Sequence, residues 1–199
     1  MPSLSASSSS ASRRLAGLRG NSALPEMRLR YWVMVRLSNT GWPSSVTTQG
    51  ILPSGLTEEG AIFDSRAITQ YLNRLSGGAL FPRNAAKRTD AERLEALADG
   101  ICDCLLAHVY ERRMRPAEKV HQPWLDLQWS KAVRALDRLN DAPPRFGKKP
   151  TAGHIALRAA LGYLDLRFAG QWERGRSKLK RWASRFDERF PELKQYLPV

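Results

Sequence analysis

The chain has 199 residues, 42% of them hydrophobic and 26% charged, so it is long enough to bury a core and has an ordinary globular composition. Its two cysteines, Cys102 and Cys104, exclude a disulfide framework and predict a reducing compartment, which we take to be the cytoplasm. No stretch approaches the roughly twenty consecutive apolar residues of a membrane-spanning helix, so we expect no membrane association.

The net charge of +13 raises the question of a nucleic-acid partner. Residues 1–57 carry +5, with six arginines, no lysine and one acid, whereas residues 58–199 carry +8. In the longer part, acids and bases alternate along helical patterns, as on a solvated surface. The basic N-terminal part lacks motifs in which basic residues are interleaved with aromatic ones, and it shows no known nucleic-acid-binding fold signature. We therefore expect no nucleic-acid partner and rank this function last.

Residues 1–57 differ in character from the rest of the chain. The serine-rich start, 1–12, predicts disorder, and only 31–37 has the β-branched and aromatic content of a strand. Three explanations remain open at this point: a targeting segment rich in serine and arginine, a degenerate or frame-shifted copy of a domain, or an unfamiliar structural half.

From residue 58 onward the sequence predicts helix after helix. Asp64 or Ser65 can begin a helix that ends at Gly77, and residues 151–166 are apolar nearly all round, as in a buried central helix. The apolar stripe of the first helix comprises Ile68, Tyr71, Leu72 and Leu75. The other helices are expected over 89–115, from 123 to before 143, and around an apolar stripe of Leu179, Trp182, Phe186 and Phe190. These patterns predict an all-α helical bundle over 86–199.

Several segments resemble the glutathione S-transferases, in their bacterial form, and do so in the family's order. Residues 57–72 resemble the end of the family's thioredoxin-like domain, where two short strands lead into an acid–serine dipeptide that begins a helix. Residues 94–103, Trp129 with 135–136, and 153–167 followed by Trp172 resemble helices of its helical domain. The resemblance implies a mostly α fold: a degenerate thioredoxin-like α/β part over 1–80, then an all-α domain over 86–199.

The resemblance implies a glutathione site at the start of the first helix. The unpaired N–H groups there favour an anion, Ser65 adds a hydroxyl, and the Asp64 carboxylate can pair with the ammonium of the γ-glutamyl group. Leu52 and Pro53 stand where the family has a hydrophobic residue before a cis proline that exposes backbone to glutathione. However, 53–56 lacks the β-branched residues of the strand expected there. Glutathione is thus the expected co-substrate, with no metal.

The family's activating residue, a serine, tyrosine or cysteine that stabilises the thiolate, has no clear counterpart. The corresponding length offers a run of serines, of which Ser9 and Ser10 are the candidates. Residues 1–57 have about the length of the family's N-terminal part but lack its hydrophobic pattern. This combination favours the explanation that they are a degenerate or frame-shifted copy. A neighbouring reading frame should then encode a normal strand, Ser-Pro loop and helix, and the absence of such a sequence from either frame would exclude a frameshift.

Tyr110 and Arg113 are candidate contacts for the electrophile.

Two functions follow from these patterns. One is a homodimeric glutathione transferase that conjugates the thiolate to small electrophiles or assists thiol-dependent reactions. The other is a non-catalytic remnant of the helical domain, or a module that binds a protein partner. His108 and His121 lack acidic or cysteine partners at ligand spacing, so we interpret them as structural, and we interpret His154 as structural from its place at a helix start. His154 replaces the acid of the family's capping box after Thr151 and can still accept a hydrogen bond when neutral.

Overall fold

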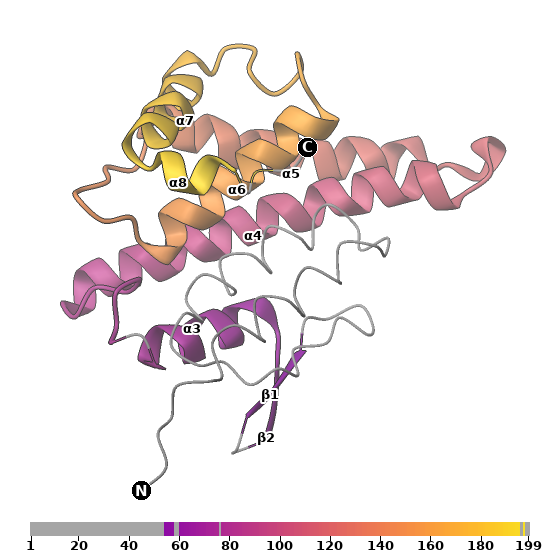
Figure 1. Cartoon of the computed structure of the whole chain (residues 1–199). Coiled ribbons are helices and arrows are strands. Elements are labelled where there is room, and N and C mark those ends of the chain that lie inside the picture. The colour runs from indigo at the N-terminus through magenta and orange to yellow at the C-terminus, as the bar shows by residue number, and fades with distance from the viewer. Residues whose placement is uncertain (1–53, 58–59, 76, 196, 198–199) are drawn as a thin grey trace, which may run out of the picture. The chain divides into compact units, whose positions relative to one another are not determined.

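The computed structural model describes residues 54–57, 60–75, 77–195 and 197 (Figure 1). The candidates Ser9, Ser10, Leu52 and Pro53 lie outside the described residues, as does the strand expected over 31–37. The chain divides into two compact units between Gly77 and Gly78.

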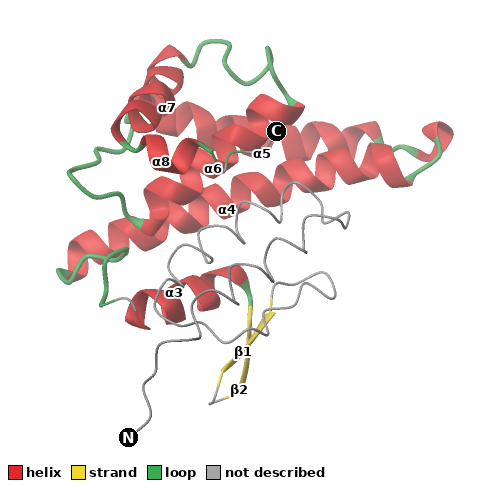
Figure 2. Ribbon diagram, in the orientation of Figure 1, coloured by secondary structure: helices red, strands yellow, loops and turns green. Residues whose placement is uncertain are grey.

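The described part of the first unit contains a two-stranded hairpin and one helix (Figure 2). Strand β1 (Ser54–Thr57) pairs antiparallel with β2 (Gly60–Phe63), in a register that runs from Thr57 opposite Gly60 to Ser54 opposite Phe63. Residues 54–56 therefore belong to a strand although they lack β-branched side chains. Ladder hydrogen bonds join backbone groups, so a paired segment can be a strand without β-branched side chains.

Helix α3 (Ser65–Leu75) follows the hairpin directly, as predicted. The described side chains buried on it are mostly polar: Ser65, Ile68, Thr69 and Asn73. The Thr69 hydroxyl donates to the Ser65 carbonyl oxygen over 2.8 Å, which satisfies one buried polar group locally. Of the expected apolar stripe, Ile68 is buried and Tyr71 is half-buried, while the side chains of Leu72 and Leu75 lie outside the described set.

The second unit is a helical bundle, as the sequence predicted. A short 3-10 turn, η2 (Ala117–Lys119), lies between its first two helices, α4 and α5. The helices are α4 (Ala85–Met114), α5 (Gln122–Asp141), α6 (Ala152–Arg167), α7 (Ser177–Arg189) and the short α8 (Pro191–Lys194). Helix α4 begins four residues before the expected start because Asn84 caps it, its side-chain oxygen accepting the Lys87 N–H over 3.0 Å.

Helix α6 lies at the centre of this unit and packs against α4 and α7. Its leucines Leu157, Leu161 and Leu164 have no exposed surface, which confirms the prediction of a buried helix. Trp172, just beyond it, is also buried, and its indole N–H donates to the Asp165 carboxylate over 3.0 Å. The core therefore forms around one helix that contacts protein on nearly every side.

Gly153, in the first turn of α6, permits a close approach to α4. A β-carbon added there would overlap the carbonyl oxygen of Ala91 and lie 2.8 Å from the Leu94 β-carbon. Real β-carbons essentially never come within 3.0 Å of another heavy atom. The backbone of α4 provides this contact, so a side chain at residue 153 would have to push the two helices apart.

His154 completes a capping box at the start of α6. Thr151 donates its backbone N–H to the imidazole Nδ1 over 3.1 Å, and its side-chain oxygen accepts the His154 N–H over 3.4 Å. Because Nδ1 accepts, Nε2 carries the proton and donates to the Arg145 carbonyl oxygen, 3.2 Å away. The histidine thus takes the place of the usual acid, as its neutral form allows.

Replacing Gly153 by alanine tests the packing of α6 on α4. We expect Gly153→Ala to lower the free energy of unfolding by about 1–3 kcal/mol, because the added methyl group overpacks the contact. Gly100→Ala is the matched control: Gly100 lies in α4, is exposed and has no described atom within 4 Å of its added β-carbon. It should stabilise by roughly 0.5–1 kcal/mol through helix propensity alone. Urea unfolding measures both, and equal effects would contradict the packing argument.

The capping box also predicts how stability depends on pH. Burial lowers the pKa of His154, and the hydrogen bond to the Arg145 carbonyl opposes part of this shift. The unfolded chain therefore binds a proton more readily, and stability should fall as pH decreases from about 7 through the ordinary histidine pKa of about 6.5.

The variant His154→Asn keeps an acceptor for the Thr151 N–H but cannot titrate in this range. Urea unfolding at about pH 7.5 and about pH 5.5 should show a smaller loss of stability for this variant than for the parent. His121→Asn, at an exposed position, serves as the control. His108, whose pKa burial also lowers, contributes to the dependence that remains. An unchanged pH dependence in His154→Asn would refute the assignment.

Candidate functional site

The first candidate site is the start of α3, where the sequence predicted Asp64 and Ser65 to act. The Asp64 carboxylate accepts the Arg66 N–H over 2.8 Å, and its backbone oxygen accepts the Ile68 N–H over 3.0 Å. Asp64 is therefore the N-cap of the helix. It is exposed, whereas Ser65 beside it is buried.

Asp64 has a φ of +76°, the only positive φ among the described non-glycine residues. Aspartate tolerates this left-handed conformation better than most residues, but the conformation still has an energetic cost. Such outliers concentrate where the chain must present particular groups to a ligand. Within the described residues the carboxylate forms no ion pair, so its charge at the helix N-terminus is available to a cation.

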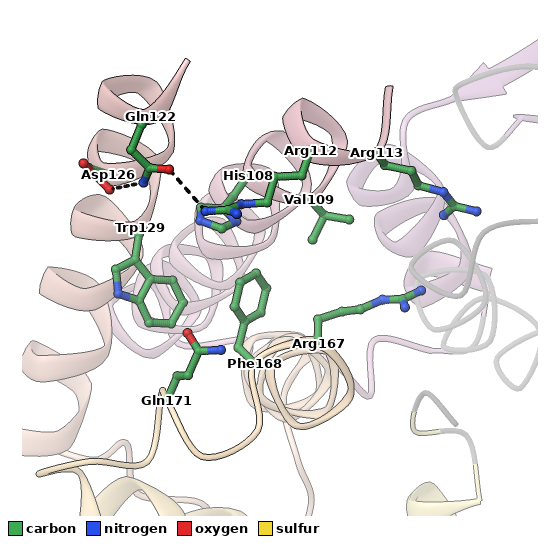
Figure 3. Close-up of a pocket in the computed structure, with 10 residues that line it drawn as sticks. All are labelled: His108, Val109, Arg112, Arg113, Gln122, Asp126, Trp129, Arg167, Phe168 and Gln171. Atoms are coloured by element: carbon green, nitrogen blue, oxygen red, sulfur yellow. Dashed lines mark hydrogen bonds between the residues drawn. The ribbon is translucent and has the colours of Figure 1, made fainter. Parts of the chain in front are cut away.

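The second candidate site is an open pocket of about 600 Å³ in the helical unit (Figure 3). Helix α4 contributes His108, Val109, Arg112 and Arg113 to its wall. Helix α5 contributes Gln122, Asp126 and Trp129, and the end of α6 with the residues after it contributes Arg167, Phe168 and Gln171. A volume in this range accommodates a small organic molecule.

Three rings form the aromatic part of the pocket. Trp129 and Phe168 stack with centroids 5.1 Å apart and planes 27° apart, and His108 meets Phe168 edge-on at 5.4 Å (Figure 3). Burial lowers the pKa of His108, the Arg112 charge lowers it further, and Asp126 acts in the opposite direction. The imidazole is therefore neutral at pH 7 and packs as a third aromatic ring.

The charged groups of the pocket are mostly cationic. Arg112, Arg113 and Arg167 line it together with one acid, Asp126. Arg112 donates to the Gln122 side-chain oxygen over 3.3 Å, and Gln122 in turn donates to Asp126 over 2.7 Å. Arg113 and Arg167 extend in the same direction, away from the three rings (Figure 3).

The structure thus brings one predicted pocket residue, Arg113, to the pocket, while the other, Tyr110, is half-buried and is not among the lining residues. Sequence reasoning missed Arg167, Phe168 and His108 as pocket residues. His108 and Arg112 are four residues apart, a spacing that places both on one face of α4. Nothing in one sequence, however, indicates which residue following α6 faces that helix.

Metal and thiol chemistry find little support in the described part of the chain. No group of three or more His, Cys, Asp or Glu side chains there is arranged to hold a metal ion. Cys102 and Cys104 are half-buried thiols that form no disulfide among the described residues. Burial is the main factor that raises the pKa of Cys104, which disfavours its reactive thiolate. No described helix is both long and apolar enough to cross a membrane.

Comparison with known proteins identifies the family. The family model described as "Glutathione S-transferase, C-terminal domain" matches residues 122–197. A glutathione transferase family member from Pseudomonas fluorescens Pf-5, with bound S-(propanoic acid)-glutathione, is 30% identical, with a TM-score of 0.72 over 89% of this chain and 97% of that one. The chain belongs to the glutathione S-transferase family. The helical unit, α4 to α8, contains the matched residues of its C-terminal domain.

Two further relatives agree with this assignment. A glutathione S-transferase from Methylobacillus flagellatus KT, with glutathione bound, is 25% identical and has a TM-score of 0.73 over 88% of this chain and 96% of that one. The GST-like protein YibF of Escherichia coli (strain K12) is 36% identical over 124 residues. The aligned region covers 59% of the present chain and 60% of YibF. The match therefore spans less than two thirds of this curated relative.

Proposed function

We propose that this protein binds glutathione and transfers its thiolate to small electrophiles. The observation that carries the proposal is Asp64, an N-cap aspartate held at a φ of +76° with no described ion-pair partner. Family membership supports it, as do relatives described with glutathione or a glutathione conjugate bound.

Glutathione would be recognised first by its γ-glutamyl end. The Asp64 carboxylate pairs with the ammonium group, and the backbone N–H groups at the start of α3, together with the Ser65 hydroxyl, face the carboxylate. The γ-glutamyl group carries an ammonium and a carboxylate, and in this assignment adjacent groups of the protein bind one each. Leu52 and Pro53, which would bind the cysteinyl backbone, stay predictions because they lie outside the described residues.

The chemical step is nucleophilic attack by sulfur. The thiol proton passes to solvent, the thiolate forms a carbon–sulfur bond, and in a displacement the leaving group departs with the electron pair of its bond. A hydroxyl that donates to sulfur favours the thiolate, and Ser9 and Ser10 remain the predicted donors. The electrophile would occupy the pocket at Arg113, with Tyr110 a predicted contact beyond its lining.

A non-catalytic role remains the second candidate, as a remnant of the helical domain or as a protein-binding module. The helical unit has a complete core around α6, so it could persist without a working glutathione site. The two functions differ in one measurable property, because an enzyme of this family must bind the thiol and a remnant need not. The division into a thioredoxin-like part over 1–80 and a helical domain over 86–199, the homodimer and the cytoplasmic location also stay predictions.

Isothermal titration calorimetry with glutathione tests the proposal. Asp64→Asn is the informative variant, because asparagine tolerates positive φ and still accepts the Arg66 N–H, so only the charge is lost. We expect it to weaken glutathione binding by about tenfold or more, since a charge-assisted hydrogen bond contributes about 1.5–3 kcal/mol. Ser65→Ala should weaken binding less.

The control is Asp90→Asn, at an exposed aspartate in α4, which should leave glutathione affinity unchanged. Far-UV circular dichroism of each variant checks that the helices persist. Absence of glutathione binding in the folded parent protein would reject the enzyme and favour the non-catalytic role. Equal binding by the parent and Asp64→Asn would reject the role of the carboxylate.

A further inference from the structure

We infer that the pocket of the helical unit selects aromatic ligands that carry an anionic group, and that Arg113 and Arg167 determine this selection. The inference deepens the proposed function and rests on it for the chemical step, because it names the substrate class as aromatic electrophiles bearing a carboxylate. The binding preference itself depends only on the helical unit.

The first argument is the balance of charge. The lining contains three arginines and one aspartate. The carboxamide of Gln122 bridges two of them: it accepts a hydrogen bond from Arg112 over 3.3 Å and donates one to Asp126 over 2.7 Å. Asp126 is therefore linked to Arg112 through Gln122. The guanidinium groups of Arg113 and Arg167 have no further acid among the lining residues. Within the described residues neither Arg113 nor Arg167 forms a hydrogen bond or an ion pair.

The second argument is the contrast with other arginines of the same unit. Arg158 is bound at two points by Asp187, with distances of 2.7 and 2.8 Å, and Arg176 is bound by Asp137 at 2.7 Å. This unit therefore pairs the arginines that stabilise its fold. Arg113 and Arg167 come from different helices and extend toward one side of one pocket (Figure 3). Two guanidinium groups on one side of the pocket give that side a positive charge, which attracts an anionic group such as a carboxylate.

The third argument is the shape of the apolar part. Trp129 and Phe168 stack 27° from parallel, and the neutral His108 stands edge-on to Phe168. Phe168 is buried, so the half-buried rings of Trp129 and His108 present the accessible aromatic surface to a flat molecule. Aromatic ligands gain from offset stacking or edge contact with such rings. A planar acid can therefore place its ring against these side chains and its carboxylate toward the arginines.

The test compares two ligands of the same shape and different charge. Binding of naphthoate and of naphthamide to the full chain is measured by calorimetry without glutathione. We expect naphthoate to bind about fivefold or more tightly than naphthamide, a preference that weakens as salt is added. In Arg113→Ala/Arg167→Ala the preference should fall below about twofold, while naphthamide affinity changes little.

Arg181→Ala is the matched control, because Arg181 is exposed on α7 and does not line the pocket. This variant should keep the full preference for naphthoate. Equal binding of the two ligands by the parent protein, failure of both to bind, or a preference that survives in the double variant would each overturn the inference.

Reaction kinetics then connect the pocket to the chemistry. With glutathione, kcat/KM for a chloronitrobenzoate should exceed that for the corresponding benzamide, and the double variant should lose this difference; the opposite order would contradict the assignment of substrate class. The two proposals fail separately. A protein that prefers naphthoate but does not bind glutathione refutes the transferase alone, whereas one that binds glutathione without a charge preference refutes the present inference alone.

Discussion

The close contact of α6 with α4 at Gly153 is the constraint on which the rest of the helical unit depends. The missing side chain lets the two backbones approach, and α6 then becomes buried on nearly all sides. The helix start is fixed by the Thr151–His154 capping box, and its end brings Arg167 and Phe168 to the pocket wall. The position of the pocket is therefore set by how α6 packs at its opposite end, about four turns away.

The helices of both units could be predicted from the sequence because their signals are local and agree with one another. Apolar residues near 151–166 indicated a helix buried on all sides, and Asp64 with Ser65 indicated a helix start. Where the prediction was incomplete, tertiary structure decided. The start of α4 depended on the Asn84 cap, and β1 forms through backbone pairing with β2 even though its composition gave no indication of a strand.

The candidate sites were predictable to different degrees for the same physical reason. Asp64 and Ser65 are adjacent, so a local motif was enough to identify them. The pocket instead combines His108, Trp129 and Arg167, which lie on three elements and are separated by 21 to 59 residues. Only packing determines which of their faces meet, and a single sequence contains no direct signal of that packing. Arg113 was the one residue of this pocket predicted from the sequence, and that prediction came from the family resemblance.

The arginines of the helical unit show how charge can separate stability from function. Burying an unpaired guanidinium is costly, so Arg158 and Arg176, both buried, are held by carboxylates. Arg113 and Arg167 are exposed and keep most of their hydration, so leaving them without an acid costs the fold little. Their charge is then available to a ligand, whose carboxylate loses less solvation at an open pocket than it would in the core. An open, cationic and aromatic pocket can thus discriminate between ligands by charge without destabilising the bundle that forms it.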